Sequence, residues 1–182
     1  SDMYMKKLVV NAAAAGAISL DLPLAENLRN VARALGKPLE HLRMVTLDKP
    51  RLQNAIAEAT QLGVKVFALP DGDVAASVLT CLQDNPYDLM YTTGGAPEGV
   101  ISACAVKALG GDMQAELIDF CEAKGESPEN RRVAMQEHRR CAEMKVEVNR
   151  IYTLSELVKG NDILFSATGV TGGELVKGIQ QV

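Results

Sequence analysis

Strand-like apolar runs alternate with segments of helical periodicity along most of this chain, and no other feature restricts the fold as strongly. Strands are predicted at residues 4–10, 42–47, 64–69, 89–93, 114–120 and 162–166. Helices are predicted at residues 24–35, 50–63, 74–82, 97–109, 128–144 and 153–158. Such alternation is typical of a mainly parallel sheet flanked by helices, because parallel neighbours need a crossover connection. With 182 residues, the chain is long enough for about one α/β domain of this kind.

Composition excludes several function classes. The net charge of −4 argues against nucleic acid or a membrane surface as partner, since binding to either needs an excess of basic charge. The sequence contains no apolar run long enough to span a membrane. Its four cysteines, Cys81, Cys104, Cys121 and Cys141, form no C-x-x-C pair, so neither a metal cluster nor a redox motif is expected. Reduced thiols, and therefore a cytoplasmic location, are the simpler expectation.

Polar residues follow several predicted strands, where a parallel sheet would gather them at one edge. Lys49 and Arg51 follow one strand and can pair with a phosphate, although they can equally be solvated side chains beside a helix start. Asp71 and Asp73 follow the next strand and can bind sugar hydroxyls or a cation. They can also form only a turn with a helix N-cap.

The run GGAPEG at residues 94–99 lies between a predicted strand and a predicted helix. Its glycines allow close backbone approach to a ligand, and Pro97 suits the first turn of a helix. Glu98 is therefore expected at a helix N-terminus, at the carboxyl end of a strand. A carboxylate there can hold a metal ion, or it can only complement the helix dipole. The residues alone leave both interpretations open.

Other polar segments are weaker candidates. The glycine-rich residues 167–173 lack the lysine of a P-loop and the spacing of a dinucleotide-binding motif. His41 and His138 are expected to have surface or packing roles. The predicted helix at residues 128–144 carries a charged face that is most simply solvated surface. That face consists of Arg131, Arg132, Glu137, Arg139 and Arg140.

Taken in order, the polar motifs resemble a known family. They are DMYMKK at residues 2–7, DKPR at 48–51, PDGDVAA at 70–76, GGAPEG at 94–99, ENRR at 129–132 and ILFSATG at 163–169. The chain resembles the class II fructose-1,6-bisphosphatases of the GlpX type over nearly its whole length. Within that family it is similar to the second paralogous branch found in enteric bacteria.

The resemblance implies a fold and an activity. The fold is that of the inositol-phosphatase-like sugar phosphatases. The activity is hydrolysis of the 1-phosphate of fructose 1,6-bisphosphate with Mn²⁺ or Mg²⁺. Substrate contacts are implied for Tyr4, Lys49, Pro50, Arg51, Asp71, Gly72, Asp73 and Gly95. Glu98 is implied as a metal ligand, which favours the metal interpretation over the helix-dipole one.

One departure limits this expectation. In the family, the other metal-binding carboxylates and the segment that positions the attacking water precede the D-x-Y-M motif. This chain begins at that motif and ends, at residues 178–182, before the last sheet strand of the family. Residues 1–182 are therefore expected to be the C-terminal substrate-binding domain of a longer phosphatase, without its N-terminal metal-binding segment. The residue that positions the nucleophile would then lie outside the chain.

Alternatives to a catalytic role remain. A non-catalytic sugar-phosphate-binding or regulatory module is compatible with the same scaffold. An oligomerisation domain, with residues 128–144 at the interface, is also compatible. A homo-oligomer, most simply a dimer, is expected. A sugar bisphosphate is the expected small-molecule partner.

Overall fold

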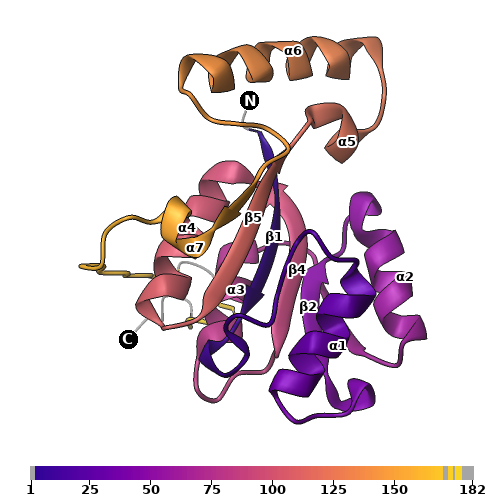
Figure 1. The fold of residues 1–182 in the computed structure, drawn as a ribbon, viewed down its shortest axis with the longest axis vertical. Coiled ribbons are helices and arrows are strands. Elements are labelled where there is room, and N and C mark those ends of the chain that lie inside the picture. Colours follow the sequence, from indigo (N-terminus) through magenta and orange to yellow (C-terminus); the bar gives the residue numbers. More distant parts are fainter. Residues whose placement is uncertain (1–2, 170–171, 174, 178–182) are drawn as a thin grey trace.

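The structure is a computed structural model that describes residues 3–169, 172–173 and 175–177 (Figure 1). Its strands are β1 (Tyr4–Val10), β2 (Arg43–Leu47), β3 (Lys65–Leu69), β4 (Leu89–Gly95), β5 (Asp112–Ile118) and β6 (Ile151–Thr153). Its α-helices are α1 (Leu24–Ala34), α2 (Gln53–Gln61), α3 (Asp73–Cys81), α4 (Ala96–Ala108), α5 (Phe120–Lys124), α6 (Pro128–Glu143) and α7 (Leu154–Leu157). Short 3-10 turns are η1 (Ala12–Ala14), η2 (Leu39–His41) and η3 (Pro50–Leu52).

Within the described residues, six strands form one mixed sheet in the order β3-β2-β4-β1-β5-β6. β2 is parallel to β3 and β4, whereas β1 is antiparallel to both β4 and β5, and β6 is antiparallel to β5. The prediction of a mainly parallel sheet is therefore wrong, although the α/β class is confirmed. Hydrophobic periodicity marks a strand but carries no information about its direction.

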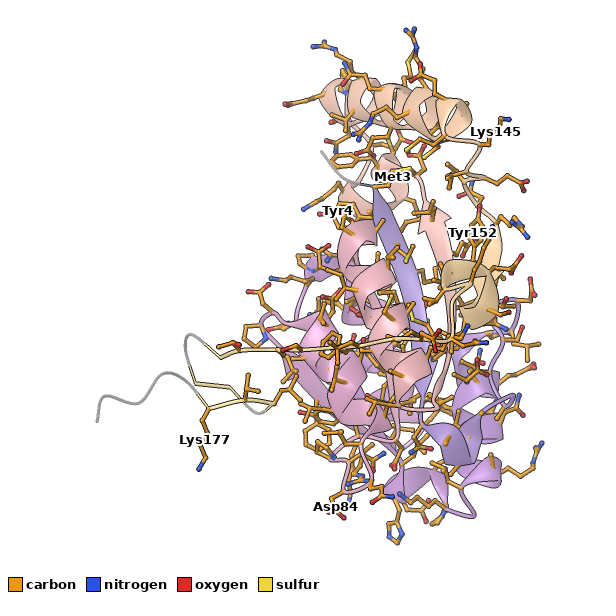
Figure 2. The ribbon with its side chains drawn as sticks, turned by 90° about the vertical axis from the view of Figure 1, so that its left-hand side faces the viewer. Met3, Tyr4, Asp84, Lys145, Tyr152 and Lys177 are labelled. Carbon is orange, nitrogen blue, oxygen red and sulfur yellow. The ribbon has the colours of Figure 1, made fainter. Side chains whose placement is uncertain are left out.

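The antiparallel direction of β1 has a direct consequence for the site. Tyr4, its first residue, pairs with Gly95 at the end of β4 and with Ile118 at the end of β5. The start of β1 therefore lies at the same sheet edge as the carboxyl ends of β2, β3, β4 and β5. Figure 2 places Met3 and Tyr4 toward the end of the molecule that carries α6, and Asp84 at the opposite end.

Helices cover both faces of the sheet, and each interface is a separate core cluster (Figure 1). On the face covered by α3 and α4, Val9 packs with Ala103 and Val106. On the face covered by α1 and α2, Leu8 packs with Leu28. Neighbouring residues of β1 thus enter opposite clusters, as the two-residue period of a strand requires.

Most predicted elements are present with boundaries within a few residues, but the C-terminal part differs. β5 ends at Ile118 because Asp119 accepts a hydrogen bond from the Cys121 amide at 2.6 Å and begins α5, which was not predicted. Residues 162–166, all of them described, do not form the predicted strand. The edge of β5 is instead paired with β6, a short strand that the sequence pattern did not reveal.

α6 shows that part of a predicted surface face is buried. Ala134, Glu137 and Cys141 are all buried, and their spacing of three and four residues places them on one side of the helix. Glu137 is only 2% exposed, so its assignment to a solvated face is wrong. Arg131 and Arg139 do point to solvent, as predicted.

Candidate functional site

Polar loops after β2, β3 and β4 meet at one sheet edge and surround a cavity of about 740 Å³. The sequence-predicted residues in its wall are Tyr4, Lys49, Arg51, Asp71, Gly72, Asp73, Gly95 and Glu98. Among the described residues, Pro50 is the predicted contact that lies outside this wall, and it begins the turn η3 that carries Arg51. The structure thus brings together the candidates from all three loops and from the start of β1.

Local backbone features direct two of these loops. Gly72 has a φ of 98°, a left-handed conformation that glycine adopts without strain, and it directly precedes Asp73 at the start of α3. Gly95 is the N-cap of α4, and Pro97 lies in its first turn together with Glu98. A Cβ atom on Gly95 would collide with the Glu98 carboxylate, so this carboxylate folds back over the end of β4.

Arg51 is held against an aromatic ring in the cavity. Its Nε donates a hydrogen bond to the Thr93 carbonyl at 2.8 Å, and its guanidinium carbon lies 5.0 Å from the centroid of the Tyr4 ring. The Lys124 ammonium lies 5.3 Å from the same centroid, and Phe120 packs edge-on against it at 5.8 Å. Two cations therefore lie against one ring, and both belong to the wall of the cavity.

Lys49 is arranged differently. Its Nζ lies 2.9 Å from Asp71 Oδ1, so the ion pair joins the loop after β2 to the loop after β3. The Asp71 side chain is 82% exposed, and an ion pair in that setting is worth only about 0–1 kcal/mol. An incoming phosphate can therefore compete with Asp71 for this lysine.

Asp73 has a buried partner. Lys7, on β1, places its Nζ 2.5 Å from Asp73 Oδ2, and the Lys7 side chain is fully buried. Burial lowers the pKa of Lys7 below its usual value, because loss of water outweighs the opposing attraction of Asp73 and, to a smaller degree, of Glu98. The ion pair ties β1 to α3, with Asp73 in the cavity wall and Lys7 outside it.

Sequence reasoning missed Lys7, Phe120 and Lys124. Lys7 carried a signal that was not used, because it stands two residues from both Met5 and Val9 and therefore shares their buried face of the strand. Phe120 and Lys124 belong to α5, whose five residues are too few to show helical periodicity. Only the Asp119 N-cap could have indicated this helix.

A metal site is incomplete in this part of the chain. The described residues contain no group of three or more His, Cys, Asp or Glu side chains placed to hold a metal ion. Glu98 offers the carboxylate oxygen that Mg²⁺ or Mn²⁺ prefers, but Asp71 and Asp73 are each engaged by a lysine. These residues alone therefore do not fit a complete Mg²⁺ shell, which needs near-octahedral oxygen ligation.

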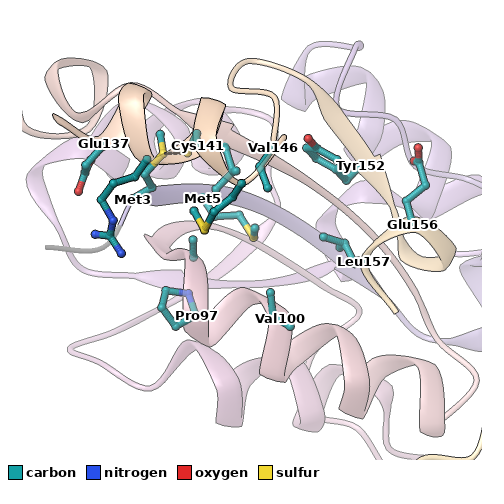
Figure 3. A pocket seen from close by; sticks show the side chains of 14 residues that line it. Met3, Met5, Pro97, Val100, Glu137, Cys141, Val146, Tyr152, Glu156 and Leu157 are labelled. Carbon is teal, nitrogen blue, oxygen red and sulfur yellow. Dashed lines mark hydrogen bonds between the residues drawn. The ribbon is translucent and has the colours of Figure 1, made fainter. Parts of the chain in front are cut away.

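A second cavity, of about 380 Å³, lies between α6, the first turns of α4 and the β6–α7 segment (Figure 3). Its wall is mostly apolar and includes Met3, Met5, Val100 and Leu157. None of the predicted site residues is in this wall. We therefore take the polar cavity, where charged groups converge, as the candidate site.

The cysteines and histidines lie outside the wall of the polar cavity. All four thiols are free, and burial raises the pKa of Cys81 to about 12, which makes it a poor nucleophile. His138 Nε2 lies 2.9 Å from Asp119 Oδ2, a contact between α6 and the start of α5. Of the glycine-rich residues 167–173, two lie outside the described residues. In the part of the chain that the structure describes, no helix combines the length and apolar character needed to cross a bilayer.

Comparison with known families decides the relationship. Residues 1–182 match the family described as bacterial fructose-1,6-bisphosphatase, glpX-encoded. The chain belongs to this family. The resemblance predicted from the GlpX-type motifs is thereby confirmed.

Relatives of this GlpX-family chain carry matching names. It is 82% identical over 180 residues to fructose-1,6-bisphosphatase 2 class 2 of Escherichia coli (strain K12), a match that covers 99% of the chain and 56% of the relative. It is 52% identical over 180 residues to fructose-1,6-bisphosphatase 1 class 2 of the same strain, covering 99% and 54%. For the class 2 enzyme of Haemophilus influenzae the identity is 51%, with the same coverage. The chain therefore spans about half the length of the curated relatives it matches.

Proposed function

We propose that this chain is the substrate-binding part of a class II fructose-1,6-bisphosphatase. The full-length protein would hydrolyse the 1-phosphate of fructose 1,6-bisphosphate, giving fructose 6-phosphate and phosphate. One observation carries the proposal: the residues implied as substrate contacts come from four separate segments, yet nearly all of them line a single polar cavity. The names of the relatives support the same reaction.

Each wall of the cavity suits a different part of a sugar bisphosphate. Arg51 would bind the phosphate remote from the metal, with Lys49 as a second, exchangeable cation. Asp71 and Asp73 would accept hydrogen bonds from sugar hydroxyls. Tyr4 would cover the ligand between Arg51 and Lys124. The backbone at Gly95 would approach the ligand closely.

Metal chemistry would be shared between this chain and another segment. Glu98 would supply one carboxylate ligand, and the remaining ligands would come from an N-terminal segment of the full-length protein. A bound Mn²⁺ or Mg²⁺ polarises phosphoryl oxygens and lowers the pKa of a bound water. The contribution of residues 1–182 is to bind and orient the sugar and to neutralise phosphate charge.

The finer architecture and location belong to the same proposal. Residues 1–182 would form the C-terminal α/β domain of an inositol-phosphatase-like phosphatase. Four free thiols suit a cytoplasmic enzyme. A homodimer is proposed as well, because Met135 on α6 and Met144, the residue directly after α6, are 75% and 60% exposed and offer apolar surface for an interface. Mass measurement of the full-length protein in solution tests this point, and a monomer would contradict it.

The proposed reaction is tested by phosphate release from fructose 1,6-bisphosphate by the full-length protein. We expect turnover that requires Mn²⁺ or Mg²⁺, stops on chelation, and is slower with fructose 1-phosphate, which lacks the remote phosphate. Binding of the bisphosphate without turnover at any metal concentration would favour the regulatory-module alternative. Absence of both binding and turnover would contradict the proposal.

A further inference from the structure

Lys7 is a buried charged residue beside the candidate site that the proposed chemistry leaves without a role. It lies in the middle of β1, between β4 and β5, and its side chain points into the face covered by α3 and α4. Its ammonium is fully buried and lies 2.5 Å from Asp73 Oδ2. A buried ion pair is weak evidence for stability, because well-packed apolar side chains often replace it without loss. Fold stability alone therefore does not account for this pair.

The two oxygens of Asp73 have different surroundings. Oδ2 accepts the hydrogen bond from Lys7, whereas the described residues offer Oδ1 no donor. The Asp73 side chain is about 10% exposed and belongs to the cavity wall. An ionised carboxylate only accepts hydrogen bonds, so its second oxygen suits a ligand hydroxyl.

The geometry around the pair is tight. A Cβ atom on Gly94 would lie 2.6 Å from Asp73 Oδ2 and 3.4 Å from Lys7 Nζ, so the absence of a side chain at this position makes room for the contact. Lys7 also lies within electrostatic reach of Glu98, which attracts it, and of Arg51, which repels it. The buried ammonium thus interacts with three of the candidate site residues without belonging to the cavity wall.

We propose that Lys7 is a positioning residue that fixes the Asp73 carboxylate so that Oδ1 accepts a hydrogen bond from a sugar hydroxyl. Lys7 thereby favours ligands that carry hydroxyls between their two phosphates, although it does not touch the ligand itself. This inference rests on the proposed function of the cavity, and it adds a residue that sets the specificity of that cavity.

The test is Lys7→Met in the full-length protein, because methionine keeps the length of the side chain and removes its charge. We expect KM for fructose 1,6-bisphosphate to rise about tenfold or more, the range for a lost hydrogen bond to a charged group, while kcat changes less. Hexane-1,6-diol bisphosphate, which has both phosphates and no other hydroxyl, serves as a competitive inhibitor. Its inhibition constant should change by less than about twofold, since it offers Asp73 no hydroxyl to bind.

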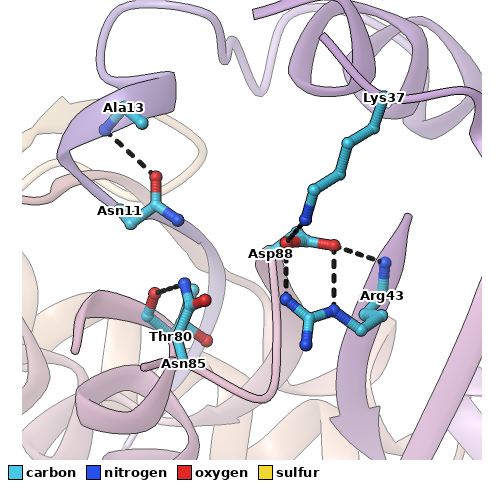
Figure 4. A network of polar contacts seen from close by, with 7 residues as sticks. All are labelled: Asn11, Ala13, Lys37, Arg43, Thr80, Asn85 and Asp88. Atoms are coloured by element: carbon cyan, nitrogen blue, oxygen red, sulfur yellow. Dashed lines mark hydrogen bonds and ion pairs between the residues drawn. The ribbon is translucent and has the colours of Figure 1, made fainter. Parts of the chain in front are cut away.

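A matched control exists at the other end of β4. Lys37 pairs with the buried Asp88 at 2.7 Å, so Lys37→Met also removes a lysine from a buried carboxylate, but outside the cavity wall (Figure 4). This variant should lose thermal stability and keep the wild-type KM. In an Asp73→Asn background, Lys7→Met should raise KM little further, because both changes act on the same hydrogen bond.

A second variant covers the case in which Lys7→Met does not fold. Gly94→Ala places a methyl group against Asp73 Oδ2 and displaces the carboxylate without removing either charge. It should show the same selective loss: KM for fructose 1,6-bisphosphate should rise, and the inhibition constant of hexane-1,6-diol bisphosphate should stay unchanged.

The outcomes separate the two claims. Suppose that the wild-type protein turns over fructose 1,6-bisphosphate, and that both variants either keep the wild-type KM or lose affinity for the sugar bisphosphate and the diol bisphosphate equally. The role of Lys7 is then overturned and the proposed function stands. If the wild-type protein neither binds nor hydrolyses the bisphosphate, the proposed function fails and this inference fails with it.

Discussion

At the scale of single residues, Arg51 and Lys49 differ more than their shared charge and shared loop suggest. Arg51 is oriented by a hydrogen bond to the Thr93 carbonyl and by the Tyr4 ring, so little side-chain freedom remains to be lost on binding. Lys49 is paired with an exposed aspartate and must leave it to bind a phosphate. A guanidinium also binds phosphate through two parallel hydrogen bonds, which an ammonium does not form.

Arg51→Ala in the full-length protein should therefore weaken the binding of fructose 1,6-bisphosphate more than Lys49→Ala does. A lost hydrogen bond to a charged group is worth about 1.5–3 kcal/mol, or roughly tenfold to a hundredfold in affinity. Steady-state kinetics with fructose 1,6-bisphosphate and with fructose 1-phosphate measure the effect. The loss should shrink for the monophosphate, and equal losses for both substrates would show that Arg51 serves the scissile phosphate or the fold.

Glu98→Gln tests the proposed metal ligand, because it keeps the side-chain shape and removes the charge. If Glu98 binds a metal ion, turnover should fall steeply and the concentration of Mn²⁺ or Mg²⁺ needed for half-maximal rate should rise. If Glu98 only complements the dipole of α4, the free energy of unfolding should fall by about 0.3–1 kcal/mol while the turnover rate stays near that of the wild type. Titration of activity against metal, alongside thermal unfolding, distinguishes the two, and near-normal turnover would contradict the metal role.

Site residues inside a short loop motif after a strand could be predicted from the sequence. Site residues placed by long-range strand pairing or by a short helix could not. Asp73 and Glu98 follow strands within short, glycine-containing motifs, so their meeting at one edge could be predicted. Lys7 could not be assigned in the same way, since its partner is 66 residues away and depends on the pairing of β1. Lys124 reaches the Tyr4 ring only because Asp119 begins a helix at the end of β5.

At the scale of elements, strand direction was the property that the sequence pattern did not contain. The first strand was predicted correctly at residues 4–10, yet its antiparallel insertion between β4 and β5 depends on long-range pairing. This insertion is what brings Tyr4 to the loops after β2 and β3. Helices with clear periodicity, such as α1, were predicted to within a residue, whereas the three-residue β6 was too short to show a pattern.

The network around Asp88 holds the opposite end of the sheet together (Figure 4). Asp88, immediately before β4, accepts hydrogen bonds from the backbone and side chain of Arg43 on β2 and from Lys37. Burial alone raises the pKa of this carboxyl, but the hydrogen bonds from Arg43 and Lys37 outweigh it, and the pKa lies below its ordinary value of 3.8. The folded state thus favours the ionised form of Asp88.

Asp88→Asn should destabilise the protein by about 1–3 kcal/mol at neutral pH, since it removes the charge that these donors bind. A depressed pKa contributes stability that is complete above the unfolded value of 3.8 and is lost as the pH falls through the folded value. The difference in unfolding free energy between wild type and variant should therefore shrink below pH 3.8. Urea denaturation at several pH values measures it, and a difference independent of pH would contradict the assignment.

At the scale of the whole molecule, the mixed sheet gathers loops from β2, β3 and β4 with the start of β1 around one polar cavity. In the proposed function the residues in this wall bind a sugar bisphosphate. Among the described residues, Glu98 is the one carboxylate in the wall that forms no ion pair with a lysine. The chain also covers only 56% of the relative to which it is 82% identical. The central claim is therefore that residues 1–182 bind the substrate and need a further segment for catalysis.

Phosphate release from fructose 1,6-bisphosphate, measured side by side for the isolated chain and for the full-length protein, tests this claim most directly. Both assays contain saturating Mn²⁺ or Mg²⁺, and circular dichroism first establishes that the isolated chain is folded. We predict metal-dependent turnover by the full-length protein and little or none by the 182-residue chain. Metal-dependent turnover by the folded chain at a rate similar to that of the full-length protein would contradict the account.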